Sequence, residues 1–219
     1  MVQFEDIKSQ IVHFGRQLSE KGLVTGTWGN LSARIPETSF AAVTPSGSNY
    51  SKLRPQDIII VNMEGNIEEG KLKPSSELPM HLAIYRARED IHAIIHTHSV
   101  FASSCAVAHK PIPCLIEDMV QVIGGSVEVA RYALPGTAEL AENAVFALGN
   151  KKAVLMANHG VIGCGISLAE AMLACELTEK AAQIFIYATQ LGGANILSNE
   201  DVSIMHKFYA EHYRNLQGG

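Results

Sequence analysis

Hydrophobic residues recur every three or four positions in several stretches of the chain, a spacing typical of helices that bury one face. Residues 4–21 carry apolar side chains at this spacing and are followed by Gly22, a residue suited to end a helix. The same reasoning predicts helices over residues 77–87, 137–148 and 167–191. The shorter apolar runs between these helices remain to form strands.

Those shorter runs are bounded by glycine, proline or asparagine, as strands usually are. They are NLSAR (30–34), AAVT (41–44), DIIIVN (57–62), IEEG (67–70), IHAIIHTHS (91–99) and the two halves of AVLMANHGVIGCG (153–165). Several of the connections are short enough to be hairpins, which join antiparallel strands. The pattern therefore predicts an α/β protein with a mixed, largely antiparallel sheet flanked by helices, rather than a doubly wound parallel sheet.

The composition fits a folded domain with a substantial core, since 47% of the 219 residues are hydrophobic. No linker, repeat or low-complexity segment divides the chain, so we expect a single domain over residues 1–219. The formal net charge of −5 and the lack of a lysine or arginine cluster argue against nucleic acid as a partner. The N-terminus has no apolar signal core and no stretch reaches membrane-spanning length, so we expect a cytoplasmic protein that binds no membrane.

Two histidines close the run IHAIIHTHS, and a third follows the strand predicted at 153–156. Residues two apart in a strand point to the same side, so His96 and His98 can direct their imidazoles at one point. His159 lies in a turn beside Gly160, and each histidine alone is more often a hydrogen-bonded structural residue than a ligand. Together they indicate a metal site, because three protein ligands with one open position are the arrangement of a catalytic zinc.

A fourth group, Glu77, begins a predicted helix directly after Ser75 and Ser76. These residues have an ordinary explanation, because serines cap helices and acids favour the first helical turn. Paired hydroxyls and free amides at a helix start also bind anions such as phosphate. The turns GTWGN (26–30) and TPSG (44–47) offer further amides and hydroxyls that can surround the same anion. Both interpretations stay open on these residues alone.

Five motifs follow one another in order along the chain: GTWGN (26–30), TPSG (44–47), PSSE (74–77), HTHS (96–99) and NHG (158–160). In these motifs the sequence from about residue 5 to 190 resembles the class II aldolase and adducin family, most of all its L-fuculose-phosphate aldolase branch. The resemblance implies a three-layer α/β/α fold with a mostly antiparallel central sheet. It also implies a homotetramer whose active sites lie between neighbouring subunits.

The resemblance assigns roles to residues of these motifs. One Zn²⁺ per chain is expected on His96, His98 and His159, although other divalent transition metals would suit the imidazoles too. Glu77 is expected to be the fourth ligand of the resting metal and also the catalytic acid/base. The phosphate of a sugar-phosphate substrate is expected against six residues, Gly29, Asn30, Ser46, Gly47, Ser75 and Ser76. The implied reaction is reversible cleavage of a ketose 1-phosphate, such as L-fuculose 1-phosphate, to dihydroxyacetone phosphate and a short aldehyde.

The chain departs from that branch on the aldehyde side of the expected site. Where the branch has a tyrosine after an Ile-Pro segment, this chain has Asp118 with Glu117 beside it. Only Tyr209 and Tyr213 are loose counterparts of the C-terminal tyrosine of the branch. We therefore expect Asp118 and Tyr213 to act at the aldehyde end. Because the acid pair has no local partner in the sequence, Asp118 is expected to reach the zinc pocket of a neighbouring subunit.

Two other kinds of function fit the motifs less well. L-ribulose-5-phosphate 4-epimerases and methylthioribulose-phosphate dehydratases are similar in sequence, but the epimerase branch usually carries aspartate at the position of Glu77. The longer acid suits proton transfer at the reacting carbon, which an epimerase must avoid, so Glu77 favours an aldolase. Adducin-like assembly modules keep the fold without the metal ligands, whereas this chain has all three histidines.

Overall fold

The computed structural model describes residues 2–213, with side chains from residue 4 to 212. The helices are α1 (Val2–Glu20), α2 (Leu78–Ala87), α3 (Val100–Val107), α4 (Glu117–Ile123), α5 (Ala138–Leu148), α6 (Leu168–Gln190) and α7 (Asn199–Phe208), with short turns η1 (Tyr50–Lys52), η2 (Pro55–Asp57) and η3 (Tyr209–Tyr213). The strands are β1 (Asn30–Arg34), β2 (Phe40–Val43), β3 (Ile59–Asn62), β4 (Ile67–Glu69), β5 (Ala93–Thr97), β6 (Val129–Ala130), β7 (Ala153–Met156) and β8 (Gly160–Gly165). Among the described helices, none is both long and apolar enough to cross a bilayer.

Within this part of the chain, eight strands form one sheet in the order β4-β3-β2-β1-β5-β8-β7-β6. Neighbouring strands run antiparallel except β6 and β7, which are parallel. The central strand β5 pairs with β1 and β8, and its register places His96 opposite Asn30 on one side and Ile162 on the other. The prediction of a mixed, largely antiparallel sheet is confirmed.

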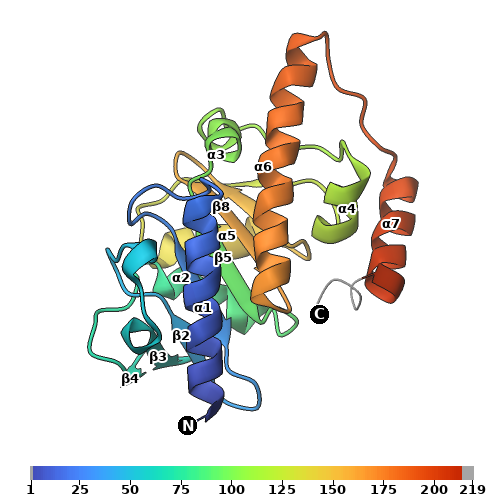
Figure 1. Ribbon diagram of the computed structural model, residues 1–219. Coiled ribbons are helices and arrows are strands. Elements are labelled where there is room, and N and C mark those ends of the chain that lie inside the picture. The colour runs from blue at the N-terminus through green and yellow to red at the C-terminus, as the bar shows by residue number, and fades with distance from the viewer. Residues whose placement is uncertain (1, 214–219) are drawn as a thin grey trace.

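Helices cover both faces of this sheet (Figure 1). α1 and α6 lie side by side on one face and contact β1, β2, β5 and β8. On the other face α2 packs beside α5, and their apolar side chains share a core with Ile59, Ile94 and Val154. A third cluster joins α3, α4 and α6 to β7 and β8, and α7 lies against α4 at the edge of the molecule. The three-layer α/β/α arrangement is therefore confirmed.

The four predicted helices are present as α1, α2, α5 and α6, with ends within two residues of those expected. The sequence pattern did not predict α3, α4, α7 or β6. α3 is apolar or small at nearly every position, so no amphipathic period marks it, and the two residues of β6 are too few to show alternation. α7 did have a usable signal, because the side chain of Ser198 caps it by accepting a hydrogen bond from the Asp201 amide.

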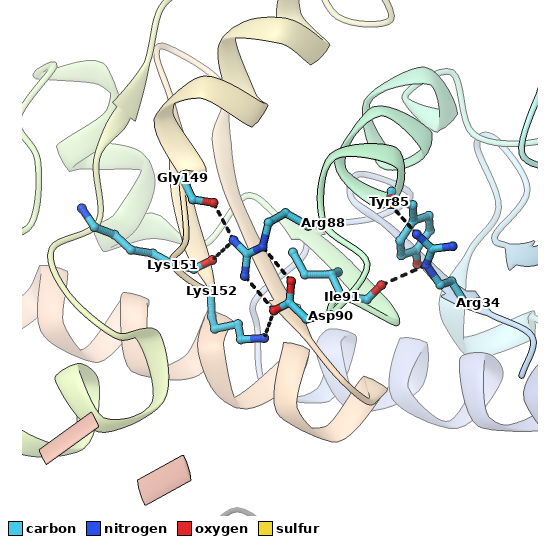
Figure 2. A network of polar contacts seen from close by, with 8 residues as sticks. All are labelled: Arg34, Tyr85, Arg88, Asp90, Ile91, Gly149, Lys151 and Lys152. Carbon is cyan, nitrogen blue, oxygen red and sulfur yellow. Dashed lines mark hydrogen bonds and ion pairs between the residues drawn. The ribbon is translucent and has the colours of Figure 1, made fainter. Parts of the chain in front are cut away.

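A network of polar contacts fixes the connection between α2 and β5 (Figure 2). Arg88, the residue after α2, donates to both carboxylate oxygens of Asp90, at 2.7 and 2.8 Å, and to the carbonyl of Gly149 at 2.5 Å. The Lys152 ammonium donates to the same carboxylate at 3.1 Å. These contacts tie the end of α2 and the approach to β5 to the start of β7, and β5 is the strand that carries His96.

Candidate active site

Three histidines, called the histidine cluster below, meet at one end of the sheet. His96 lies in β5, His98 just beyond that strand, and His159 in the turn between β7 and β8. One ring nitrogen from each lies within 4.8 Å of the others, and the Nε2 atoms of His96 and His98 are 2.8 Å apart. His96 is fully buried, whereas the other two are partly exposed. His96 and His98 therefore point to one place, as the strand geometry predicted, and the turn between β7 and β8 brings His159 to them.

The orientation of His96 directs Nε2 at the cluster. Its Nδ1 lies 3.0 Å from the carbonyl oxygen of Val161, which can only accept, so Nδ1 carries the proton of the neutral ring and Nε2 does not. Burial lowers the pKa of His96 to about 4 and also lowers the pKa of His98. Both rings are therefore neutral near pH 7, the form in which an imidazole binds a metal.

The turn that carries His159 is shaped by its neighbours. A Cβ atom on Gly160 would lie 2.4 Å from the carbonyl oxygen of Thr97 and 3.0 Å from Cδ2 of His98, so the close approach of this turn to β5 and to the histidine cluster requires glycine. Asn158 has a φ of 55°, and its side-chain oxygen lies 2.7 Å from Nε2 of His109 in the loop after α3. The lack of a side chain at Gly160 lets the turn approach the other two rings, and the contact of Asn158 with His109 holds the turn in place.

Glu77, the buried residue directly before α2, completes the cluster. Its Oε2 lies 3.2 Å from Nε2 of His96, and its Oε1 lies 3.1 Å from Nε2 of His159. Asn30 donates from Nδ2 to Oε2 at 2.7 Å. Burial alone would raise the pKa of the Glu77 carboxyl, but the neighbouring His96 and His159 and the hydrogen bond from Asn30 outweigh it, so the pKa lies below its usual range. An ionised carboxylate therefore faces the histidines.

Two loops lie side by side next to Glu77, one after β2 and one before α2. The amide of Ser46 donates to the carbonyl of Lys73 at 2.9 Å, and the amide of Ser75 donates to the carbonyl of Thr44 at 3.1 Å. The hydroxyl of Ser75 accepts a hydrogen bond from the amide of Glu77 at 3.2 Å. Ser75 therefore closes a local turn before α2, as serines commonly do, at a place where two predicted anion-binding loops meet.

A cavity of about 250 Å³ opens beside these groups. Its wall includes Glu77, two of the three histidines and all six residues expected to bind phosphate, namely Gly29, Asn30, Ser46, Gly47, Ser75 and Ser76. No lysine or arginine lines it within the described chain, so an anion would be held by hydroxyls, amides and the N-terminus of α2.

Sequence analysis gave no individual role to four further wall residues, Thr27, Trp28, Pro45 and Pro135. The indole ring of Trp28 stacks on the imidazole of His98 with centroids 5.9 Å apart, while the residue remains 66% exposed. The available signal was its position in the GTWGN motif, as the sole tryptophan of the chain. Trp28 gives the open side of the histidine cluster an aromatic cover.

Comparison with known proteins identifies the family. The profile described as Class II Aldolase and Adducin N-terminal domain matches residues 9–186. The chain belongs to the class II aldolase and adducin family. It is 36% identical over 200 residues to the 5-deoxy-D-ribulose 1-phosphate aldolase of Bacillus thuringiensis serovar kurstaki, over 91% of this chain and 93% of that protein.

Two L-fuculose phosphate aldolases are similar to a comparable degree. The enzyme of Escherichia coli strain K12 is 34% identical over 197 residues, which cover 90% of each chain. A solved structure of an L-fuculose 1-phosphate aldolase superimposes with a TM-score of 0.91 at 38% identity, over 94% of this chain and 96% of that one. These relatives confirm the expected class of enzyme, a lyase of the aldolase type.

The donor set of this class II aldolase fits a divalent transition metal. Neutral imidazoles and a carboxylate are the ligands that zinc prefers, and the hydrogen bond from His96 to the Val161 carbonyl is of the kind that fixes the ring of a metal-bound histidine. Gly160 leaves the space between the rings free of side chain. The residues that would hold the metal are His96, His98, His159 and Glu77.

The residues expected on the aldehyde side lie away from this cavity in their own chain. Asp118, in α4, bonds the ammonium of Lys180 in α6 and does not line the cavity. The expectation that the acid pair lacks a local partner is wrong for Asp118, because α6 packs against α4 and brings in a lysine 62 residues away. Tyr209 is buried in the cluster beneath α4 and α6, and the side chain of Tyr213 lies outside the described residues.

Proposed function

We propose that this class II aldolase uses a divalent metal to cleave a ketose 1-phosphate reversibly into dihydroxyacetone phosphate and a short aldehyde. Zn²⁺ suits the site best, since tetrahedral sites of nitrogen and carboxylate ligands are typical of it. The observation that carries the proposal is the position of Glu77, between His96 and His159 and at the wall of the cavity. This position places an acid/base beside both a metal-binding set and an anion-binding set.

The substrate meets different surroundings at its two ends. Its phosphate binds the hydroxyls and amides of the loops before α2 and after β2, which brings the neighbouring ketone to the histidine cluster. When bound, the metal supplies a Lewis acid that polarises a carbonyl and balances developing negative charge. In the direction of addition, Glu77, oriented by Asn30, removes a proton from the carbon next to the ketone. In the direction of cleavage the same carboxylate takes up the proton that the sugar hydroxyl loses and returns it to the carbon released by cleavage.

The substrate class follows from the two kinds of named relative taken together. L-Fuculose 1-phosphate and 5-deoxy-D-ribulose 1-phosphate are both ketose 1-phosphates that end in a methyl group. Trp28 and Pro135 give the cavity of this chain an apolar wall, which suits such a terminus. We therefore assign it a deoxy-ketose 1-phosphate and, as product, an aldehyde that keeps the methyl group.

We also propose a homotetramer in which a neighbouring subunit completes the aldehyde side of each site. Asp118 is the residue expected to reach across, and Tyr213 near the end of the chain is expected to assist. The side chains of Asp118 and Lys180 are about half exposed, and exposed ion pairs contribute little stability, so Asp118 can exchange that partner for another at small cost.

A substrate screen tests the proposed reaction. Zinc-loaded protein would be given L-fuculose 1-phosphate, 5-deoxyribulose 1-phosphate or L-ribulose 5-phosphate, with dihydroxyacetone phosphate measured by a coupled dehydrogenase. We expect the two 1-phosphates to yield dihydroxyacetone phosphate. A chelator should abolish this activity and Zn²⁺ should restore it. His98→Ala should lose the activity, whereas His13→Ala, which removes an exposed histidine of α1, should keep it. Epimerisation of L-ribulose 5-phosphate without cleavage of either 1-phosphate would contradict the proposal.

A further inference from the structure

The interface between β1 and α2 is polar along its length although it is buried. Successive residues of a strand face opposite sides, and Leu31 and Ala33 of β1 pack in the core beneath α1. The side chains of Asn30, Ser32 and Arg34 therefore face α2. Each of them bonds Glu77 or a residue of α2.

The contacts follow the spacing of both elements. Asn30 donates to Glu77 at 2.7 Å. Two residues further along β1, the Ser32 hydroxyl lies 2.6 Å from Nδ1 of His81 and 2.8 Å from the hydroxyl of Tyr85. Glu77, His81 and Tyr85 are four residues apart, on one face of the helix. These residues and Arg34 are called the polar row below.

Arg34 ends the polar row, because it donates to the carbonyl of Tyr85 and its guanidinium lies 4.8 Å from the centre of the Tyr85 ring (Figure 2). Two residues of a strand advance by about 6.6 Å and four residues of a helix by about 6 Å, so the two spacings stay in step. A shift of α2 by one residue relative to β1 would break all of these contacts at the same time. The polar row therefore fixes the register of α2 against β1.

This register is held by side chains with almost no access to water. His81 and Tyr85 are 0% exposed and Ser32 is 1% exposed. Burial lowers the pKa of His81 to about 3, so its ring is neutral, and the Glu77 carboxylate is near enough to act on it electrostatically. Apolar side chains could fill the same space without desolvating polar groups, but their packing is not directional and selects one register less strongly.

We propose that His81 is a positioning residue for Glu77. Through its bond to Ser32 it holds the first turn of α2 so that the Glu77 carboxylate meets the histidine cluster. The inference rests on the proposed function, because it takes Glu77 as a metal ligand and acid/base. His81 does not line the cavity, so it acts through Glu77 and not on the substrate.

The test compares His81→Ala with His81→Asn and Tyr85→Phe. Zinc affinity, measured by competition with a chromogenic chelator, should fall roughly 10- to 100-fold in His81→Ala, and kcat should fall similarly, the usual effect of removing a partner that orients a metal ligand. KM for the phosphorylated substrate should stay within about twofold, because backbone hydrogen bonds between residues 44–46 and 73–75 hold the phosphate loops without His81. Asparagine places a polar atom where Nδ1 was, so His81→Asn should recover most of both losses. Tyr85→Phe removes the other bond to Ser32 and should keep zinc affinity and kcat.

Two results would overturn the inference. One is wild-type zinc affinity and kcat in His81→Ala. The other is an equal loss in Tyr85→Phe, which would assign the effect to the polar row as a whole and not to His81. If His81→Ala does not fold, Ser32→Ala removes the partner of both His81 and Tyr85 with a smaller change, and it must show the loss of zinc affinity that Tyr85→Phe does not. Chelator competition needs no substrate, so it separates the two claims. If the wild type binds no zinc, the proposed function fails. If the wild type and the variants bind zinc equally, only this inference fails.

Discussion

Replacing the two serines before α2 one at a time separates phosphate binding from stabilisation of the turn that precedes the helix. Ser75 is buried and its hydroxyl accepts the amide of Glu77, whereas Ser76 is exposed at the wall of the cavity. A hydrogen bond to a charged group is worth about 1.5–3 kcal/mol, so either change to alanine should weaken a phosphorylated ligand roughly 10- to 150-fold. Ser75→Ala also loses its hydrogen bond to the Glu77 amide, worth about 1 kcal/mol, which corresponds to a fall in Tm of about 2–4 °C for a chain of this size.

The assay measures the affinity of each variant for dihydroxyacetone phosphate and for dihydroxyacetone, together with Tm. We expect both variants to bind dihydroxyacetone phosphate more weakly while their affinity for dihydroxyacetone is unchanged. Only Ser75→Ala should have a lower Tm. Ser9→Ala, on the exposed face of α1, is the control and should change neither. Equal losses for the two ligands would refute the reasoning, because the serines would then act only on the helix.

Three further predictions concern the metal, the folded state and assembly. Elemental analysis of protein purified without a chelator should find about one zinc per chain. Loading with zinc should also change the fluorescence of Trp28, the sole tryptophan, which stacks on His98. A lack of metal that added zinc does not restore, or uptake of zinc without a change in emission, would argue against the site. Asp90→Asn should lower the free energy of unfolding at pH 7 by about 1 kcal/mol, a value reduced for the exposure of the carboxylate. Hydrogen bonds from Arg88 and then Lys152 lower the pKa of Asp90 in the folded protein. The stabilisation is therefore present above the unfolded pKa of about 3.9 and is lost as the pH falls below it. A difference in the free energy of unfolding between wild type and variant that stays constant from pH 7 to 3 would exclude this cause. Light scattering should find a tetramer, and a fully active monomer would show that no neighbouring subunit is needed.

The parts of the fold that the sequence predicts are those with a strong local period. α1 and α6 alternate apolar and polar faces over many turns, and the convergence of His96 and His98 needs only the geometry of one strand end. The pair of Asp118 with Lys180 depends on how α4 and α6 pack, which no local pattern encodes. His81 likewise lies within an apolar helix, and only the position of Ser32 on another element shows its role.

The central claim, that Glu77 is the acid/base of a class II aldolase, is tested most directly by proton exchange. Dihydroxyacetone phosphate in deuterated solvent should exchange one prochiral proton when incubated with metal-loaded enzyme, even without an aldehyde, and an NMR time course follows the loss of that signal. Glu77→Gln keeps the size of the side chain but removes the base, so exchange should slow by roughly 10²- to 10⁴-fold. Glu139→Gln, which changes an exposed acid of α5, should exchange like the wild type. No exchange by the wild type, or equal exchange by the wild type and Glu77→Gln, would contradict the account.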